Sequence, residues 1–308
     1  MKKSLLALAV LGAFAGAASA QSSVTVYGKL NVEAGKLIGS KDKTLNDVAG
    51  SRLGFRGVED LGGGMKATFG MEHRFNPATG ADATAGARFW NGYSKAGIAG
   101  GFGHIEVGRD YVVNFLMVQN QIDPFGGDTA AALRGIGMIP GGGSVRYNSQ
   151  VEYHLSANGF NFGAQVAGAN ENSGTKKAYS FAANYAAGPL FVAAGYENGA
   201  NVNDKLLDLG ARYNFGPATL AVGYSKGTNT AGASAKGYLI GATVPMGAGD
   251  FKVGYARSQV AGVTNAAKMG VGYHHNLSKR TKVFVDFARD SKAATEKSGY
   301  DVGMQHNF

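Results

Sequence analysis

VTVYGKLNVE, residues 24–33, sets the pattern for the whole chain. Its apolar and polar side chains alternate. Because successive side chains of a β-strand point to opposite faces, one face of this segment is apolar and the other carries Tyr27, Lys29 and Glu33. Such alternation suits a soluble β-sandwich as well as a membrane β-barrel, so the number and order of the segments must decide between them.

The alternation returns along the chain, each time followed by turn residues. Sixteen segments show it, at residues 24–33, 51–57, 65–74, 88–98, 102–109, 145–155, 160–169, 178–186, 190–197, 206–215, 219–225, 237–244, 251–258, 268–275, 282–289 and 298–308. Tight turns rich in Gly, Pro and Asn alternate with longer polar loops between them. An even strand number with this alternation of loop length is typical of outer-membrane barrels, and sixteen strands leave room for an aqueous channel. The sequence therefore predicts an all-β fold, a 16-stranded antiparallel transmembrane β-barrel.

Residues 1–20 have the features of a signal peptide. Lys2 and Lys3 form a basic start, an apolar run follows from Leu5 to Ala15, and Ala18-Ser19-Ala20 is a small-residue cleavage site. The apolar run is shorter than the ~20 residues that a membrane-spanning helix needs. We expect residues 1–20 to be removed and residues 21–308 to form one barrel domain. The chain has no cysteine, so an exported fold here does not rely on disulfides.

The connection Tyr111–Gly143 breaks the repeating pattern. It is long, shows no strand alternation, and contains only two acidic residues, Asp123 and Asp128. A long connection without regular secondary structure inside a compact domain is either functional or disordered. We expect this one to fold inward and narrow the lumen of the barrel.

Basic side chains gather on the polar faces of the strands that frame this loop. They are Lys29, Arg52, Arg56, Lys66, Arg74 and Arg146, with Glu33 and Glu72 on the same faces. A charge facing lipid at the bilayer midplane costs about 2–4 kcal/mol, so the alternation places these groups in the lumen. They form either an ordinary wetted wall or a basic strip that sets ion selectivity, and the residues alone leave both readings open.

Composition and histidine positions argue against other classes of function. The net charge is +9, or +7 without Lys2 and Lys3. The sequence has no basic run with interleaved aromatic residues, the pattern that is typical of nucleic-acid binding. By parity only His104, His154 and His274 can face the lumen. None shares a segment with a Ser–Asp pair, and we find no His/Glu cluster at metal-ligand spacing. We expect no enzyme, no metal and no cofactor, although calcium bound by exposed loops stays open. The acidic residues that could bind it include Asp42 and Asp47.

Several motifs carry a family resemblance. They are VYGK at 26–29, SRLGFRGVEDLGGG at 51–64, the segment 100–109, PFGGD at 124–128 and the terminal Phe308. With them the mature chain resembles the general diffusion porins of the Gram-negative trimeric family, and most of all those of beta-proteobacteria such as Comamonas, Bordetella and Neisseria.

The resemblance implies specific roles. It makes Tyr111–Gly143 the third extracellular loop, which forms the constriction in that family, and it matches Lys29 and Arg52 to the family's basic cluster. Further candidates for this basic cluster are Arg74, Arg88, Arg134 and Arg146. The candidates on the loop side of the constriction are Asp123, Pro124, Phe125, Gly126, Gly127 and Asp128. It also implies a homotrimer in the outer membrane, contacts with its lipid and lipopolysaccharide, and a C-terminal Phe308 that the outer-membrane assembly machinery recognises.

One departure from the family affects the expected selectivity. Many relatives have a Glu between the Pro and Phe of the loop motif, whereas here Phe125 follows Pro124 directly. The loop is therefore poor in negative charge, and together with the net charge of +7 this predicts anion preference. We expect passive diffusion of ions and small hydrophilic solutes. The alternatives are a substrate-specific channel, a barrel enzyme or an adhesin.

Overall fold

A computed structural model describes residues 22–83, 88–172, 174–201, 203–229 and 231–308. The expected signal peptide, residues 1–20, lies outside the described residues. The strands are β1 (Ser23–Lys36), β2 (Thr44–Asn46), β3 (Arg52–Gly62), β4 (Met65–Arg74), β5 (Tyr93–Gly100), β6 (Gly103–Tyr111), β7 (Arg146–Ala157), β8 (Phe160–Ala167), β9 (Ala178–Ala187), β10 (Leu190–Asn198), β11 (Lys205–Asn214), β12 (Thr219–Thr228), β13 (Ser234–Met246), β14 (Gly249–Val260), β15 (Val263–Asn276), β16 (Thr281–Asp290) and β17 (Ser298–Asn307). The helices are α2 (Val113–Met117), η1 (Gln119–Gln121), α3 (Arg134–Gly137) and η2 (Asn170–Asn172).

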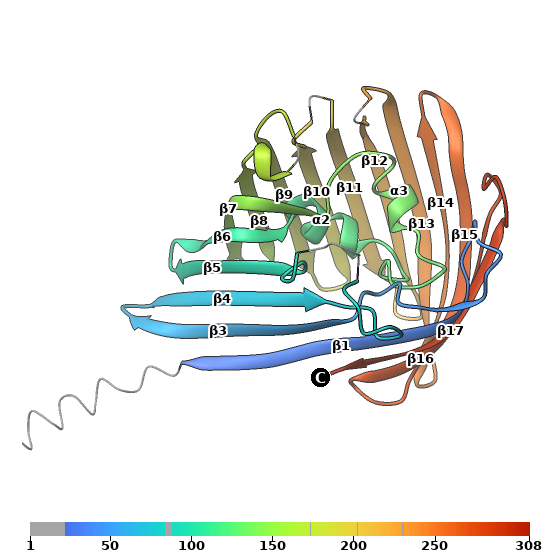
Figure 1. Cartoon of the computed structure of the whole chain (residues 1–308), viewed down its shortest axis with the longest axis horizontal. Coiled ribbons are helices and arrows are strands. Elements are labelled where there is room, and N and C mark those ends of the chain that lie inside the picture. The colour runs from blue at the N-terminus through green and yellow to red at the C-terminus, as the bar shows by residue number, and fades with distance from the viewer. Residues whose placement is uncertain (1–21, 84–87, 173, 202, 230) are drawn as a thin grey trace, which may run out of the picture.

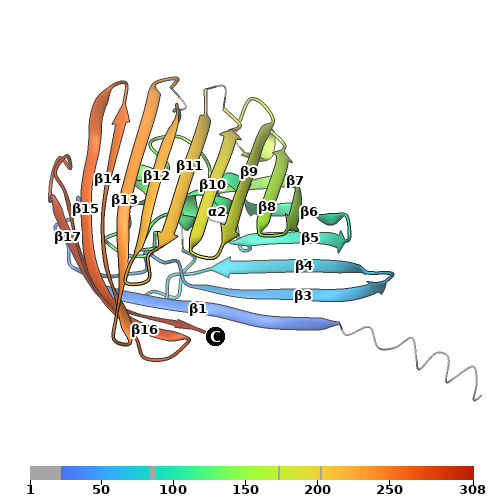
Figure 2. The same ribbon diagram turned by 180° about the vertical axis from the view of Figure 1, so that it is seen from behind.

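The sheet closes on itself. Each long strand pairs antiparallel with its neighbours in sequence, and β1 pairs with both β3 and β17. The first and last strands therefore lie side by side in both views (Figures 1 and 2). β2 is a three-residue addition to β1 from within the first long loop. Sixteen strands thus form the barrel, and the predicted fold class is confirmed.

The C-terminal residue completes the closure. The Phe308 backbone N–H donates to the Gly28 carbonyl at 3.1 Å, and the Gly28 N–H donates back to the Phe308 carbonyl at 3.0 Å. A closed ladder leaves no unpaired strand edge, which is the condition for a sheet in lipid. The last residue of the chain is thereby fixed to the first strand.

The two faces of the wall differ as the alternation predicts. In β11, Leu207 and Leu209 are 41% and 45% exposed, whereas Leu206 and Asp208, which alternate with them, are buried. The same exposed apolar positions recur along the other strands. The outward face is therefore apolar and suited to lipid, and the inward face carries the polar and small residues.

The segment between β6 and β7 packs against this inward face (Figure 1). It is not structureless, because it contains α2, η1 and α3, whose turns are closed by local hydrogen bonds such as Leu116 N–H to Val112 O at 2.9 Å. Its buried apolar side chains form the main core of the molecule together with small inward residues of β9–β16. We call the inner face of β9–β16 the docking wall, and the inner face of β1 and β3–β7 the open wall.

In the described part of the chain, no helix is long and apolar enough to span a membrane.

Three strand boundaries differ from the prediction by five residues: β3 continues to Gly62, β15 begins at Val263, and one segment begins late. The segment expected at 88–98 begins as a strand only at Tyr93. Before it, the Phe89 ring stacks on His73 at 4.4 Å, and the Asn91 side chain accepts the Arg74 backbone N–H at 2.7 Å. These side-chain contacts replace the strand ladder where alternation alone suggested that it continues.

Candidate functional site

A cavity of about 210 Å³ lies between the open wall and the packed loop. Its charged lining residues are Lys29, Arg52, Arg74, Arg134, Arg146 and Asp128. Strands β1, β3, β4 and β7 supply four of the cations, and the loop supplies the fifth together with the one carboxylate. Five cationic groups around one carboxylate make this cavity strongly basic.

Tyr111, the last residue of β6, holds two of these cations side by side. The Arg146 guanidinium carbon lies 4.0 Å from the Tyr111 ring centroid, and that of Arg74 lies 5.9 Å from it. Arg74 also donates a hydrogen bond to the Tyr111 hydroxyl. The other face of the stack is Phe115, 5.5 Å away, over which the Arg134 guanidinium lies at 4.8 Å. Aromatic faces attract cations, so this stack offsets part of the repulsion between like charges.

The remaining cations are held by neighbouring oxygen atoms. Arg52 donates to the carbonyl oxygens of Gly50 and Ala49 at 3.0 and 2.7 Å, which leaves its charge uncompensated by any acid in these contacts. Lys29 pairs with Asp128 of the loop at 3.1 Å. The one carboxylate of the cavity is therefore already engaged with one of the five cations.

Asp123 serves the loop itself. Its carboxylate accepts the backbone N–H groups of Phe125, Leu133 and Arg134 at 2.9, 2.7 and 2.8 Å. The side chain is buried, and this burial raises the pKa of Asp123 above its usual value. Sequence reasoning placed Asp123 among the constriction residues, and the structure uses it to fold the loop tip.

The rest of the loop motif divides between the two walls. Phe125 is buried with its ring 6.4 Å from His274, and the Pro124 carbonyl accepts a hydrogen bond from Lys252 at 2.6 Å, so both face the docking wall. Gly126 and Gly127 have φ angles of +68° and +73°, a conformation that glycine adopts without strain. This turn brings the following Asp128 to Lys29 on the open wall.

The other basic residues predicted from the sequence lie elsewhere. Arg56 lines a larger cavity of about 440 Å³, with its guanidinium 5.3 Å from the Tyr27 ring. Lys66 is exposed at the opposite end of β4 from Arg74, eight residues or roughly 26 Å along the strand. Arg88 is exposed and lines a third cavity, of about 190 Å³, which Arg146 also borders.

Two lysines near the loop were missed by sequence reasoning. Lys252 donates to Pro124 as described, and Lys268 donates to the carbonyl oxygen of Ala132 at 2.8 Å. Both lysines belong to the docking wall and bind the backbone of the loop. Strand alternation assigns both lysines to the polar strand face, but the sequence does not show that their strands contact the loop.

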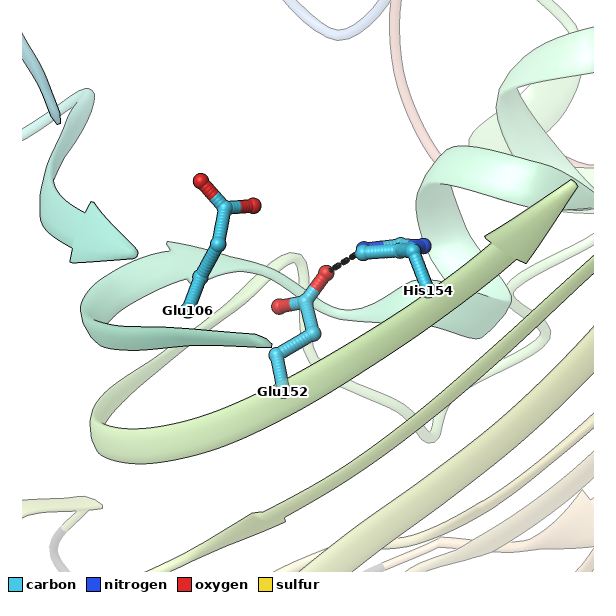
Figure 3. A group of neighbouring side chains, drawn as sticks. All are labelled: Glu106, Glu152 and His154. Atoms are coloured by element: carbon cyan, nitrogen blue, oxygen red, sulfur yellow. Dashed lines mark hydrogen bonds and ion pairs between the residues drawn. The ribbon is translucent and has the colours of Figure 1, made fainter. Parts of the chain in front are cut away.

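The expectation that no His/Glu cluster has metal-ligand spacing is wrong. Ligand atoms of Glu106, Glu152 and His154 all lie within 4.8 Å of one another on the open wall (Figure 3). The residues come from β6 and β7, so their proximity depends on the pairing of two strands that a long loop separates.

Comparison with known proteins points to one family. A sequence model described as Gram-negative porin matches residues 7–295. The chain is 33% identical to the outer membrane porin protein 32 of Delftia acidovorans and 29% identical to an outer membrane porin protein of Bordetella pertussis, with 100% of each chain covered in both alignments. In structure it resembles the anion-selective porin from Comamonas acidovorans, with a TM-score of 0.77 and 26% identity, over 94% of this chain and 100% of that one.

Proposed function

The chain belongs to the Gram-negative porin family and is an outer-membrane porin, and from this premise we propose that segment 111–143 and the basic residues facing it form the constriction of an anion-preferring, water-filled channel. Ions and small hydrophilic solutes would cross it passively. The constriction consists of Lys29, Arg52, Arg74, Arg134 and Arg146 on one side and the loop tip around Asp128 on the other.

The observation that carries this proposal is the charge imbalance of the 210 Å³ cavity. Five cations line it, of which Lys29 is paired with the one lining carboxylate, Asp128, and Arg74 is paired with the neighbouring Glu72 at 3.0 Å. Among the described residues, the other three cations, Arg52, Arg134 and Arg146, form no ion pair with a carboxylate. Asp123, the other acid of the loop, is buried in backbone hydrogen bonds. A narrow gap with low-dielectric walls focuses such a field, which raises the local concentration of anions and lowers that of cations. The structurally similar porin from Comamonas acidovorans is anion-selective, which supports the same preference.

The test is single-channel recording in a planar bilayer under a KCl gradient. We expect stepwise conductance with a reversal potential on the chloride side. Arg74→Gln and Arg146→Gln should each move that potential toward zero, because each removes one of the two cations stacked on Tyr111. A reversal potential on the potassium side for the unaltered protein would contradict the proposed anion preference.

Two control variants distinguish the effect of the electric field in the cavity on ion selectivity from the effect of the net charge of the protein. Lys66→Gln removes one positive charge from the open wall away from the cavity, and Arg257→Gln removes one from an exposed side chain that bonds Thr264. Both should leave the reversal potential close to that of the unaltered protein. Equal shifts in all four variants would mean that overall charge, and not this cavity, sets the selectivity.

We further propose that Phe308 is an assembly signal. Its carboxyl-terminal position, its exposed ring and its pairing with Gly28 suit a group that is presented before the barrel closes and is then fixed by closure. Deleting Phe308 should lower the yield in the outer membrane of cells, whereas protein refolded in detergent should keep its conductance. An unchanged yield in cells would refute this role.

The proposed assembly is a homotrimer whose outward apolar faces contact one another and the lipid and lipopolysaccharide of the outer membrane. Family membership and the exposed apolar outer positions support it. Light scattering with correction for bound detergent would give the mass of the folded species. A monomer mass for functional protein would overturn the trimer.

We infer a passive channel that catalyses no reaction. Thr68 and Glu106 both approach the same atom of His104, Nε2, at 2.9 and 3.6 Å. A hydroxyl–imidazole–carboxylate relay needs the two partners on different ring nitrogens, so this arrangement does not activate the threonine. Hydrolysis of ester or peptide substrates by the purified, folded barrel would contradict the inference.

A further inference from the structure

Two short motifs face each other on neighbouring strands of the open wall. β6 carries His104-x-Glu106 and β7 carries Glu152-x-His154. In the register of this pair, His104 lies opposite His154 and Glu106 lies opposite Glu152. The alternate positions, such as Ile105, are exposed on the outer face. The pairing therefore places two imidazoles and two carboxyl groups as a four-membered array on the inner face.

Glu106 presents one of its two oxygen atoms to this array. Its Oε2 accepts a hydrogen bond from Lys95 at 2.8 Å. Its Oε1 points the other way and lies 3.6 Å from Nε2 of His104. That imidazole nitrogen also lies 2.9 Å from the Thr68 hydroxyl. Lys95 thus fixes the orientation of the Glu106 carboxyl group and leaves Oε1 directed at an imidazole.

Glu152 repeats the arrangement on the neighbouring strand. Its Oε2 accepts a hydrogen bond from Gln150 at 2.7 Å, and its Oε1 contacts Nε2 of His154 (Figure 3). The Glu152 and Glu106 side chains are 2% and 8% exposed, whereas those of His154 and His104 are 25% and 28% exposed. Each carboxyl group is therefore buried and held by a hydrogen bond to its Oε2 atom, whereas each imidazole is more exposed.

Carboxyl groups outnumber ammonium groups around this array. Three carboxyl groups, those of Glu106, Asp110 and Glu152, gather around one ammonium, that of Lys95, which bonds Glu106 at 2.8 Å and Asp110 at 2.5 Å. Like charges directly opposite each other on paired strands are destabilising. Histidine binds a metal ion in its neutral form, so in the metal-bound state the three carboxylates and Lys95 leave two negative charges, which a dication would neutralise.

We propose that this array is a binding site for a divalent transition-metal ion, with Zn²⁺ as the best-matched ion. Glu106, Glu152 and His154 are its core ligands and His104 is the fourth. Zinc takes imidazole nitrogen and carboxylate oxygen at about 2.0–2.2 Å in tetrahedral geometry. Tetrahedral ligation at these bond lengths places ligand atoms about 3.4 Å apart. The core ligand atoms already lie within 4.8 Å of one another, so changes in side-chain rotation are enough to reach that geometry. Lys95 and Gln150 would orient the two carboxylates through their hydrogen bonds to the Oε2 atoms.

The ligand types distinguish this site from a calcium or magnesium site. Calcium prefers six to eight oxygen ligands, and magnesium keeps several waters. Two imidazoles among four ligands favour zinc and its neighbours. The site is reached from the barrel interior, because Lys95, Glu106 and Asp110 line the 440 Å³ cavity. It lies toward the short turns that follow β5 and β7, which face the periplasm in outer-membrane barrels.

The first test is isothermal titration of ZnCl₂ into the full, folded protein in detergent, without an affinity tag. We expect one saturable site per chain. His154→Ala and Glu152→Gln should each weaken zinc affinity by more than the roughly tenfold to hundredfold loss that follows removal of a residue that only orients a ligand. Titration with CoCl₂ should give the intense visible absorption of tetrahedral cobalt, and both variants should lose it.

His275→Ala is the matched control, because it removes an imidazole from a residue outside this array, near Tyr273. It should bind zinc as the unaltered protein does. Heat-modifiable electrophoretic mobility confirms that each variant is folded before titration. The proposal is overturned if the unaltered protein shows no saturable zinc binding, or if the two ligand variants bind zinc as tightly as the unaltered protein does. Calcium binding as tight as zinc binding would also overturn it.

Discussion

The docking wall and the open wall are built by the same strand alternation, yet their inward residues differ in kind. On the docking wall, small residues such as Ala193, Gly210 and Gly223 lie under the loop, and a side chain added at either glycine would meet Ile122. On the open wall, the inward residues are large and charged, as Arg52 and Arg74 are, and they face a cavity. Small inward residues therefore mark where the loop packs, whereas the clustered cations around Arg52 and Arg74 face a cavity.

This difference follows from packing. A loop that lies on a wall excludes water, so each buried side chain needs a complementary space and each buried polar group needs a partner. On the open wall, cations remain hydrated and need only to be held in place. Stability should therefore depend mainly on the docking wall and ion selectivity mainly on the open wall.

The largest effect on stability is expected at Asp208 of the docking wall. It is fully buried and accepts hydrogen bonds from the side-chain amides of Asn114 and Gln119 at 2.6 and 2.8 Å. Asp208→Ala leaves both amides unpaired, which costs about 1–3 kcal/mol for each. Asp208→Asn keeps one acceptor and should lose less. Denaturant unfolding in micelles measures the free energy of unfolding of both.

Asp128→Ala is the open-wall counterpart. Its ion pair with Lys29 is partly exposed, with side-chain exposures of 29% and 14%, so removing it should cost about 1 kcal/mol or less. The same variant should move the reversal potential further to the chloride side. Equal losses of stability in Asp128→Ala and Asp208→Ala would remove the distinction between the two walls.

An effect on stability smaller than that of Asp208→Ala is expected from overpacking of the docking wall. A Cβ at Gly210 would lie 2.5 Å from Cδ1 of Ile122, so Gly210→Leu forces the loop off the docking wall at a cost of about 1–3 kcal/mol. The displaced loop should lower the single-channel conductance and make the current noisier. Thr25→Leu adds bulk beside the 440 Å³ cavity of the open wall and should leave the current steady. A steady current with unchanged conductance in Gly210→Leu would mean that the loop does not depend on this contact.

Strand alternation and loop length were enough to predict the barrel. Alternation also assigns Lys29, Arg52, Arg74 and Arg146 to the polar strand faces, and these four residues line one cavity. Alternation gives the face of a residue but not its height along the pore, which is why Lys66 was grouped with Arg74 although the two lie at opposite ends of β4. The role of Asp123 depends on hydrogen bonds within a loop that has no periodicity. The array around Glu106 and Glu152 needs the register of two strands that the chain joins through that loop.

The smallest expected effect is a difference in pH dependence between two loop carboxyl groups. Burial raises the pKa of Asp123 above its usual value of 3.8, so its stabilising contribution is complete below pH 3.8 and is lost as pH rises through the raised pKa. The hydrogen bond from Lys36, 2.5 Å long, lowers the pKa of Glu296 below its usual 4.5. The Glu296 contribution is therefore complete above pH 4.5 and is lost as pH falls through the lowered pKa.

Thermal unfolding midpoints of the unaltered protein, Asp123→Asn and Glu296→Gln, measured from about pH 3 to pH 7, separate the two signs. The advantage of the unaltered protein over Asp123→Asn should shrink as pH rises, because only the unaltered protein must keep a buried charge at neutral pH. Its advantage over Glu296→Gln should shrink as pH falls, because protonation ends the ion pair with Lys36. Slopes of the same sign in both comparisons would show that the Asp123 carboxyl group is not buried within the loop but is as accessible to water as that of Glu296.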